Sequence, residues 1–268
     1  MSATSMSVQH TAFVTGGGSG FGLAIAKKLL STGSKVAIGD INADHLAQAR
    51  DHLGKEALYI NIDVTSPSST ESAIAECVEK FGSLSALINS AGIINITPLS
   101  EISEKEWDQI INVDLKGVFL CSKTAAPLLC ASEHGRIINI GSDASHTGFP
   151  MLHHYCAAKH GVIGLTKSLA AELAPHKVTV NCVCPIGTPS TGMGQQLLSW
   201  KTSTSNASPS EIIKNTSETV PLKRNGTVDD VVHTIMFLLS EEANFITGIS
   251  IDVDGGRASA KPIAGVNN

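Results

Sequence analysis

The sequence predicts a doubly wound α/β fold with one parallel, seven-stranded sheet. Short apolar runs alternate along the chain with segments of helical periodicity, and signals for tight hairpins are scarce. Several of the runs are almost continuously hydrophobic, which is typical of strands covered by helices on both faces. No linker or repeat interrupts the pattern, so we predict that residues 1–268 form a single domain with tails at residues 1–8 and 258–268.

The alternation gives the elements in their order along the chain. The predicted strands are residues 11–15, 35–40, 57–64, 84–91, 135–142, 178–185 and 249–253. The predicted helices are residues 21–31, 42–53, 67–81, 103–130, 153–174 and 227–240. Ser103, followed three positions later by Glu106, has the pattern of a capping box and marks the beginning of the fourth helix.

Residues 186–226 interrupt this rhythm. They are rich in Ser, Thr, Asn, Gly and Pro, which disfavours regular structure, and loops this long inside a compact domain usually serve as lids or binding loops. Met193, Leu197, Leu198 and Trp200 are apolar and would have no purpose in a fully solvated loop. We therefore predict a lid that orders over bound substrate. The alternative is that these residues pack permanently on the core or at a subunit contact.

The composition excludes several classes of protein. Apolar residues make up 42% of the chain and charged residues 16%, which suits a large core and not a disordered chain. A net charge of −5 argues against a nucleic-acid-binding surface and against a polybasic membrane anchor. Since no apolar run reaches about 18 residues, no membrane-spanning segment is expected. The N-terminus lacks the features of a signal peptide, so a cytoplasmic location is predicted.

The six cysteines and ten histidines are not predicted to bind a metal. Among the cysteines only Cys182 and Cys184 are close in the sequence, and their spacing is not that of a zinc site, so we expect reduced, mostly buried thiols. His146, His153 and His154 are grouped, but no partners at metal-ligand spacing accompany them. His146 or His153 is a candidate for the wall of a substrate pocket; otherwise these histidines are expected at the surface or at a subunit interface.

A glycine-rich turn follows the first predicted strand and opens the first helix. It reads Thr15-Gly16-Gly17-Gly18-Ser19-Gly20-Phe21-Gly22. Glycines let the backbone turn sharply and bring amide groups against a pyrophosphate, which then lies at the positive N-terminus of the helix. This turn, at the start of an alternating α/β chain, predicts a Rossmann-type dinucleotide site. The expected contacts are Gly16, Ser19, Gly20 and Phe21.

Asp40 ends the second predicted strand, 20 residues after Gly20. A carboxylate at this point can accept hydrogen bonds from the hydroxyls of the adenosine ribose. The same carboxylate would repel the 2′-phosphate of NADP, and the next residues, Ile41 and Asn42, supply no compensating positive charge. The predicted cofactor is therefore NAD, with Ile41 also in contact, and NADP is the less favoured alternative.

Several motifs resemble those of the short-chain dehydrogenase/reductase family over about residues 8–257. They are Gly16-x-x-x-Gly20-x-Gly22, Asp63-Val64, Asn89-Ser90-Ala91-Gly92, Asn112, Ser142 placed 13 residues before Tyr155, Tyr155-x-x-x-Lys159 and Val253-Asp254-Gly255-Gly256. The resemblance implies a catalytic group made of Asn112, Ser142, Tyr155 and Lys159. It also implies a homo-oligomer, a tetramer or a dimer, and cofactor contacts from Asp63, Val64, Asn89, Ala91, Gly92, Tyr155 and Lys159.

One departure from the family pattern falls after the sixth predicted strand. The family has Pro-Gly there, whereas this chain has Pro185-Ile186-Gly187-Thr188-Pro189-Ser190. Ser190 stands where a threonine of the family contacts the nicotinamide carboxamide. Thr188 and the backbone of Ile186 are weaker candidates for the same contact, and Pro185 is expected beside them.

The chemistry of the catalytic group can also be argued from its residues. Tyr155 and Lys159 are four positions apart on a predicted helix and so share a face. A phenol titrates near pH 10, but a neighbouring ammonium favours the phenolate, so Lys159 is expected to lower the pKa of Tyr155 and make it the acid/base. Ser142 would hold the substrate oxygen beside Tyr155. The resemblance implies that Lys159 also bonds the nicotinamide ribose and that Asn112 holds a water for proton transfer to solvent.

The candidate pocket positions are mostly apolar and include no arginine. They are residues 93–95, 143–146, 150–153, 186 and 187, with Met193, Leu197, Leu198 and Trp200 of the lid. A neutral, hydrophobic or cyclic secondary alcohol or ketone fits them best, and an acyl-carrier-protein thioester fits less well, because that partner is acidic. The alternatives are an NADPH-dependent ketoreductase, for example of 3-oxoacyl type, a related dehydratase or epimerase, or a non-enzymatic nucleotide-binding scaffold.

Overall fold

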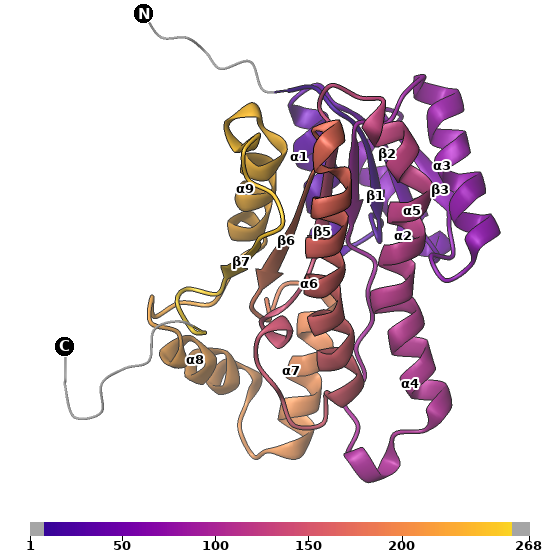
Figure 1. Cartoon of the computed structure of the whole chain (residues 1–268). Coiled ribbons are helices and arrows are strands. Elements are labelled where there is room, and N and C mark those ends of the chain that lie inside the picture. The colour runs from indigo at the N-terminus through magenta and orange to yellow at the C-terminus, as the bar shows by residue number, and fades with distance from the viewer. Residues whose placement is uncertain (1–7, 259–268) are drawn as a thin grey trace, which may run out of the picture.

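The structure is a computed structural model that describes residues 8–258, and it contains a seven-stranded sheet (Figure 1). The strands are β1 (Thr11–Thr15), β2 (Lys35–Asp40), β3 (Ala57–Asn61), β4 (Ala86–Asn89), β5 (Arg136–Ile140), β6 (Thr179–Pro185) and β7 (Ser250–Val253). Their order in the sheet is β3-β2-β1-β4-β5-β6-β7, and all neighbours are parallel. The predicted fold class is confirmed.

Helices cover both faces of this sheet (Figure 1). The α-helices are α1 (Gly20–Ser31), α2 (Ala43–Leu53), α3 (Pro67–Phe81), α4 (Glu104–Ile111), α5 (Gly117–Cys130), α6 (His153–Leu173), α7 (Gly192–Thr204), α8 (Pro209–Thr219) and α9 (Val228–Leu239). Two shorter elements matter for the site: the π turn η2 (Asn112–Lys116) and the 3-10 turn η3 (Asp143–Ser145).

Side chains that alternate along each strand fill two separate cores. On one face Ala12 and Val14 of β1 pack in a cluster with Leu29 of α1 and Ile235 of α9. On the other face Phe13 packs with side chains of α3, α5 and α6. Because both faces are buried, the strands need apolar residues at nearly every position, which is the pattern that the sequence contains.

The strand order places a crevice at one edge of the sheet. The chain builds the sheet outward from β1 to β3, then returns to pair β4 with β1 and builds outward to β7. The loops after β1 and β4 therefore leave the carboxyl edge in opposite directions, which opens a crevice between them. The glycine turn follows β1 and residues 90–92 follow β4, so both lie at this crevice.

The predicted helical segment from about Ser103 to Cys130 is helical from Glu104 to Cys130, but it contains a π turn that the sequence did not predict. The π turn η2 separates α4 from α5 and places the side chain of Asp114 in the interior, where it is fully buried. Gly117, at the end of this turn, packs so closely on Val64 that a Cβ would lie 2.8 Å from Val64 Cγ2. The apolar periodicity continues through the turn, so the sequence pattern gave no sign of it.

The capping-box prediction at the beginning of α4 holds in one half. The hydroxyl of Ser103 accepts a hydrogen bond from the amide of Glu106 at 3.2 Å. The Glu106 carboxylate, however, accepts a hydrogen bond from the Thr97 hydroxyl and contacts His154, so it does not return to the Ser103 amide.

The prediction that residues 186–226 lack regular structure is wrong. Helices α7 and α8 form there and lie against each other at the carboxyl end of the sheet (Figure 1). Thr191 caps the first turn of α7. Ser208 and Glu211 form a capping box at the beginning of α8, and Pro209 occupies its first turn. Several hydroxyls within these helices donate to carbonyl oxygens four residues earlier, which accommodates a Ser- and Thr-rich sequence in a helix.

None of the helices within residues 8–258 is long and apolar enough to cross a membrane. The two predicted tails fall, apart from residues 8 and 258, outside the described residues.

Candidate active site

A cavity of about 750 Å³ follows the carboxyl edge of the sheet from the glycine turn to α7. The predicted site residues in its wall are Gly16, Ser19, Gly20, Phe21, Asp40, Ile41, Asp63, Val64, Ala91, Gly92, Ser142, Tyr155, Lys159, Pro185, Ile186 and Thr188. Three other predicted site residues, Asn89, Asn112 and Ser190, do not line it. The size is within the range of small-molecule and cofactor sites, about 300–1,000 Å³.

The glycine turn has the geometry that a pyrophosphate requires. Gly16 has a left-handed φ of +61°, and a Cβ on it would lie 2.7 Å from the Cα of Ala91, so the loops after β1 and β4 can touch only because residue 16 has no side chain. Ser19 is the N-cap residue of α1 and makes no side-chain capping hydrogen bond. The first amides of α1 are therefore left for a ligand at the positive end of the helix.

Asp40 is held in the wall by the backbone around it. Its carboxylate accepts hydrogen bonds from the amides of Gly18 at 3.1 Å and Asn42 at 3.0 Å, and only 7% of the residue is exposed. Ile41, beside it, is 66% exposed. The imidazole of His45, a wall residue that sequence reasoning missed, has its Nδ1 3.8 Å from Asp40 Oδ1.

The segment after β4 contributes backbone more than side chains. Ser90, Ala91 and Gly92 line the cavity, whereas the side chain of Asn89 points into the protein. Its amide donates to Asn139 Oδ1 at 2.8 Å and to a serine hydroxyl of α5 at 3.2 Å. Asn89 thus links β4 to β5 and α5 by hydrogen bonds and stabilises the cavity wall without lining it.

In the loop after β6 the cavity is lined by Thr188, the weaker of the two expected hydroxyl residues, and not by Ser190. Ser190 is exposed and lies outside the wall, whereas Thr188 and Thr191 are buried and line it. The Thr188 hydroxyl donates to the carbonyl of Ile186 at 3.1 Å. Thr188 and Thr191 are therefore the hydroxyl residues of this loop that line the cavity, and Thr191 was missed by sequence reasoning.

Ser142, Tyr155 and Lys159 lie together in the wall, from the N-cap of η3 and two successive turns of α6. The phenol of Tyr155 is 5% exposed and its hydroxyl donates to Met193 Sδ at 3.6 Å. Lys159 Nζ lies 5.6 Å from the centre of the Tyr155 ring. The Ser142 hydroxyl donates to Asp143 Oδ1 at 2.9 Å, so it must turn away from that carboxylate to reach a substrate.

The pKa of Tyr155 is raised in this structure, not lowered as the sequence analysis expected. Burial raises it most; the Lys159 ammonium lowers it, but the carboxylates of Asp114 and Asp143 oppose the ammonium and the net shift of the pKa is upward. A phenol with a raised pKa carries its proton at neutral pH. In this state Tyr155 can donate a proton, and it must first lose its own proton to act as a base.

Asp114 is the ion-pair partner of Lys159, and it weakens the effect of Lys159 on the pKa of Tyr155. Its Oδ2 lies 3.2 Å from Lys159 Nζ, and its Oδ1 accepts the amide of Ile93 at 2.9 Å. The ammonium also donates to the carbonyl of Ile140 at 3.1 Å. Burial lowers the pKa of Lys159, but Asp114 and Tyr155 raise it further, so the ammonium stays charged. Burial raises the pKa of Asp114 against the opposing effect of Lys159.

Asn112, the residue expected to hold a relay water, does not line the cavity. It begins η2, and its carbonyl accepts the amide of Gly117 in the π turn. The side chain that reaches Lys159 from this region is Asp114, two positions later. The spacing of an ordinary α-helix could not have indicated it, because the π turn changes which residues face inward.

Neither His146 nor His153 lines the cavity. The next histidine, His154, is fully buried beside the site; its Nδ1 accepts the amide of Tyr155 at 2.9 Å, and its Nε2 lies 3.2 Å from Glu106 Oε1. This pair holds the beginning of α6, and with it Tyr155, against α4.

Another part of the cavity wall combines apolar side chains with positive charge. The apolar part is Ile93, Ile94, Ile96, Phe149, Met151, Leu152, Met193, Leu197, Leu198 and Trp200. Lys201 of α7 and Arg257, just after β7, also line it, although no arginine was expected there from the sequence. Arg257 Nη1 lies 3.6 Å from Asp143 Oδ2. Burial and the Arg257 guanidinium lower the pKa of Lys201, and Asp143 opposes this effect. The Lys201 and Arg257 side chains are therefore close enough for their charges to repel each other.

Comparisons with known proteins identify the family of the chain. Residues 10–202 match the family model described as short chain dehydrogenase, and the chain belongs to that family, as its motifs indicated. The chain is 39% identical over 246 residues to a 2-(S)-hydroxypropyl-CoM dehydrogenase of Xanthobacter autotrophicus, covering 91% of this chain and 94% of the relative.

Two solved structures illustrate the fold with bound cofactor. A 3-ketoacyl-(acyl-carrier-protein) reductase of Brucella melitensis complexed with NADH has a TM-score of 0.83 at 30% identity, over 92% of this chain and 97% of that one. A variant of the actinorhodin polyketide ketoreductase with NADPH has a TM-score of 0.88 at 31% identity, over 94% and 98% of the two chains. Both nicotinamide cofactors therefore occur among similar proteins.

Proposed function

We propose that this oxidoreductase uses NAD to interconvert a secondary alcohol and a ketone. The observation that carries the proposal is the meeting of Ser142, Tyr155 and Lys159 in a cavity that continues to the glycine turn and Asp40. The test is a panel of secondary alcohols and ketones with each nicotinamide cofactor, followed by nicotinamide absorbance. Turnover of alcohols or ketones is expected. Nucleotide binding without turnover of either class would favour the non-enzymatic scaffold instead.

The residues of the chain account for the proton in this reaction. When bound, NAD⁺ would accept the hydride and NADH would donate it; the glycine turn would hold the pyrophosphate and Asp40 the adenosine ribose. In ketone reduction the Ser142 hydroxyl donates a hydrogen bond to the carbonyl oxygen, and Tyr155 gives its proton to that oxygen. The Lys159 ammonium stabilises the phenolate that remains. In alcohol oxidation the same proton returns from the substrate oxygen to Tyr155.

The choice of NAD rests on Asp40 and its neighbours. A 2′-phosphate would meet the Asp40 carboxylate, which is fixed by two amide hydrogen bonds and cannot turn away without losing them. The wild type is expected to prefer NAD in kcat/KM by about two orders of magnitude, since a misplaced charge pair costs a few kcal/mol. Asp40→Ala combined with Ile41→Arg is expected to move the preference toward NADP.

Asp40→Asn is the matched variant, because the amide can keep an acceptor for Gly18 or Asn42 while the charge is removed. It should improve kcat/KM for NADP and change kcat/KM for NAD much less. Equal use of the two cofactors by the wild type would overturn the proposed preference for NAD, and a preference for NADP would favour the NADPH-dependent alternative.

The cavity supports a hydrophobic or cyclic carbon skeleton near Tyr155. Lys201 and Arg257 also bring two positive charges to the wall beside the Asp143 carboxylate, which favours a substrate with a negative group there over a wholly neutral one. Arg257→Met removes the interaction between the guanidinium and a substrate carboxylate. It is therefore expected to raise KM about tenfold, or about 1.4 kcal/mol, for a ketone that ends in a carboxylate.

The methyl ester of the same ketone is the control, and its KM should stay within about twofold in the Arg257→Met variant. The KM of the carboxylate substrate should also rise with salt, because the cations are only partly buried. An equal loss with acid and ester would mean that Arg257 acts by packing on Phe149 and not by charge.

We retain the proposal that residues 186–226 form a lid, now with α7 and α8 as its moving part. Met193 contacts the Tyr155 hydroxyl, and the Gln196 side chain donates to the carbonyl of Ile94 at 2.9 Å, so α7 closes the cavity on this side. Trypsin is expected to cut the free enzyme rapidly near Lys201 or Lys214 and more slowly after cofactor and substrate are added. Equal resistance in both states would leave a fixed wall.

The second candidate is an NADPH-dependent ketoreductase of 3-oxoacyl type, which the similarity to a 3-ketoacyl-(acyl-carrier-protein) reductase favours. The cofactor panel and the Asp40 variants distinguish it. We further propose a single domain and a homo-oligomer, which the family resemblance implies to be a tetramer or a dimer. Exposed Trp107 and Phe119 on α4 and α5, and Phe237 on α9, support such contacts. Six cysteines without a disulfide support the proposed cytoplasmic location.

A further inference from the structure

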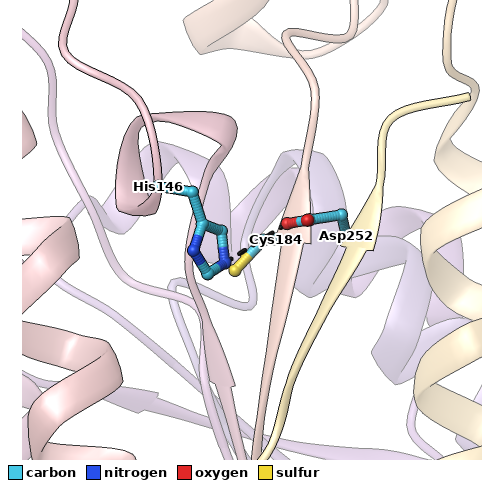
Figure 2. Close-up of side chains that lie close together, drawn as sticks. All are labelled: His146, Cys184 and Asp252. Carbon is cyan, nitrogen blue, oxygen red and sulfur yellow. Dashed lines mark ion pairs between the residues drawn. The ribbon is translucent and has the colours of Figure 1, made fainter. Parts of the chain in front are cut away.

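Three side chains of metal-ligand type meet near the carboxyl edge of the sheet. His146 follows η3, Cys184 lies in β6 and Asp252 lies in β7, and Figure 2 shows all three directed toward one another. One imidazole nitrogen, the thiol sulfur and one carboxylate oxygen lie within 4.8 Å of each other. The distance from His146 Nε2 to Asp252 Oδ1 is 3.3 Å. These residues are far apart in the sequence, so spacing alone could not reveal them.

The separations suit a tetrahedral ion. Bonds of about 2.0–2.3 Å from zinc to nitrogen, oxygen and sulfur place neighbouring ligand atoms roughly 3.3–3.7 Å apart in a tetrahedron. The imidazole and the carboxylate already have this separation. The thiol lies within 4.8 Å of both, so a shift of the order of 1 Å completes the set.

The donor set also selects the class of ion. One nitrogen, one sulfur and one carboxylate oxygen suit a borderline-soft ion such as zinc and not magnesium or calcium, which prefer oxygen ligands throughout. A thiolate and a carboxylate together neutralise a divalent charge. An ordinary His–Asp ion pair would explain the 3.3 Å contact, but it would not require a thiol beside both partners.

The position leaves a path for the ion. Cys184 is fully buried, whereas the side chains of His146 and Asp252 are 33% and 32% exposed. The ion would enter from solvent on the side of His146 and Asp252, and its fourth position would face water. None of the three residues lines the active-site cavity. We propose that His146, Cys184 and Asp252 form a binding site for a thiophilic divalent cation such as zinc, distinct from the active site.

The test uses the full chain without a histidine tag, titrated with Co²⁺ in the presence of a phosphine reductant. A tetrahedral site with a thiolate gives a thiolate-to-cobalt charge-transfer band and strong visible bands. We expect these bands to saturate at one ion per chain, to disappear when Zn²⁺ is added, and to persist in millimolar Mg²⁺. Absence of the charge-transfer band, or displacement of Co²⁺ by Mg²⁺, would overturn the proposal.

Variants assign the ligands. Cys184→Ser should abolish the charge-transfer band, and His146→Asn and Asp252→Asn should each weaken Zn²⁺ binding at least about tenfold, since loss of outer partners alone costs that much. Cys184 is buried, so its variant can fail to fold. The variants of His146 and Asp252, whose side chains are partly exposed, test the site independently of Cys184.

The matched controls are Cys130→Ser, at a thiol that is not fully buried, and His176→Asn, at an exposed histidine; both should bind like the wild type. Unchanged affinity in both His146→Asn and Asp252→Asn would sink the assignment. Neither substrate nor nicotinamide cofactor is used, so the outcome is independent of the proposed reaction.

Discussion

Replacing Tyr155 by phenylalanine is expected to reduce turnover by about 10³-fold or more while leaving NAD affinity nearly unchanged. General acid–base groups contribute about 10²–10⁴-fold to the rate of a reaction. Among the described residues that line the cavity, no other tyrosine is present to replace Tyr155. The ring itself fills a buried position beside Met193 and is retained, so the variant should fold. Turnover by nicotinamide absorbance and NAD affinity by fluorescence titration measure the two quantities.

Tyr59→Phe is the matched control, because the chain has only two tyrosines. Tyr59 lies in β3, where its hydroxyl donates to the carbonyl of Gly54, and its loss should not change kcat. More than a few per cent of wild-type activity in Tyr155→Phe would show that Tyr155 is not the acid/base.

The raised pKa of Tyr155 gives the direction of the pH dependence. Reduction uses the protonated phenol, so its rate should be constant at neutral pH and fall only in the alkaline range. Oxidation uses the phenolate, so its rate should rise with pH. We expect the positive charge of bound NAD⁺ to bring the apparent pKa for oxidation below 10, whereas the free enzyme should show no tyrosinate absorbance until above pH 10.

Lys159→Met is expected to damage stability as well as catalysis. The substitution removes the ammonium 3.2 Å from the fully buried Asp114 and leaves that carboxylate with one amide donor. Breaking one partner of a buried pair costs about 3–5 kcal/mol, so a marked fall in the thermal midpoint should accompany loss of turnover and weaker NAD binding. Calorimetry or circular dichroism gives the first quantity, and the assays above give the others.

The double variant Lys159→Met with Asp114→Asn separates the two effects. It removes both charges, so most of the lost stability should return while turnover stays low. If the double variant were as unstable as Lys159→Met, Asp114 would not be the source of the instability. Asp114→Asn alone should lower the apparent pKa for oxidation, because Asp114 raises the pKa of Tyr155.

The sequence contained enough information for the fold, because each strand is buried on both faces and must be apolar throughout. The boundaries of α1, α3 and α6 could be predicted to about one residue, since glycines, Ser66 with Pro67, and apolar periodicity mark them locally. The same local signals were present at Thr191 and Ser208, but the high content of Ser and Thr concealed α7 and α8. Their capping residues were the sign that could have revealed them.

The sequence by itself determined the glycine turn, the position of Asp40 and the Tyr155–Lys159 pair, since the turn and the pair depend on local spacing and Asp40 ends an apolar strand. Only the tertiary structure decided what surrounds them. Asp114 reaches Lys159 because of a π turn, Arg257 reaches the substrate cavity from the end of β7, and His146 meets Cys184 and Asp252. All parallel strands end at the same edge of the sheet, so loops far apart in the chain converge there, and no local pattern records which side chains they bring together.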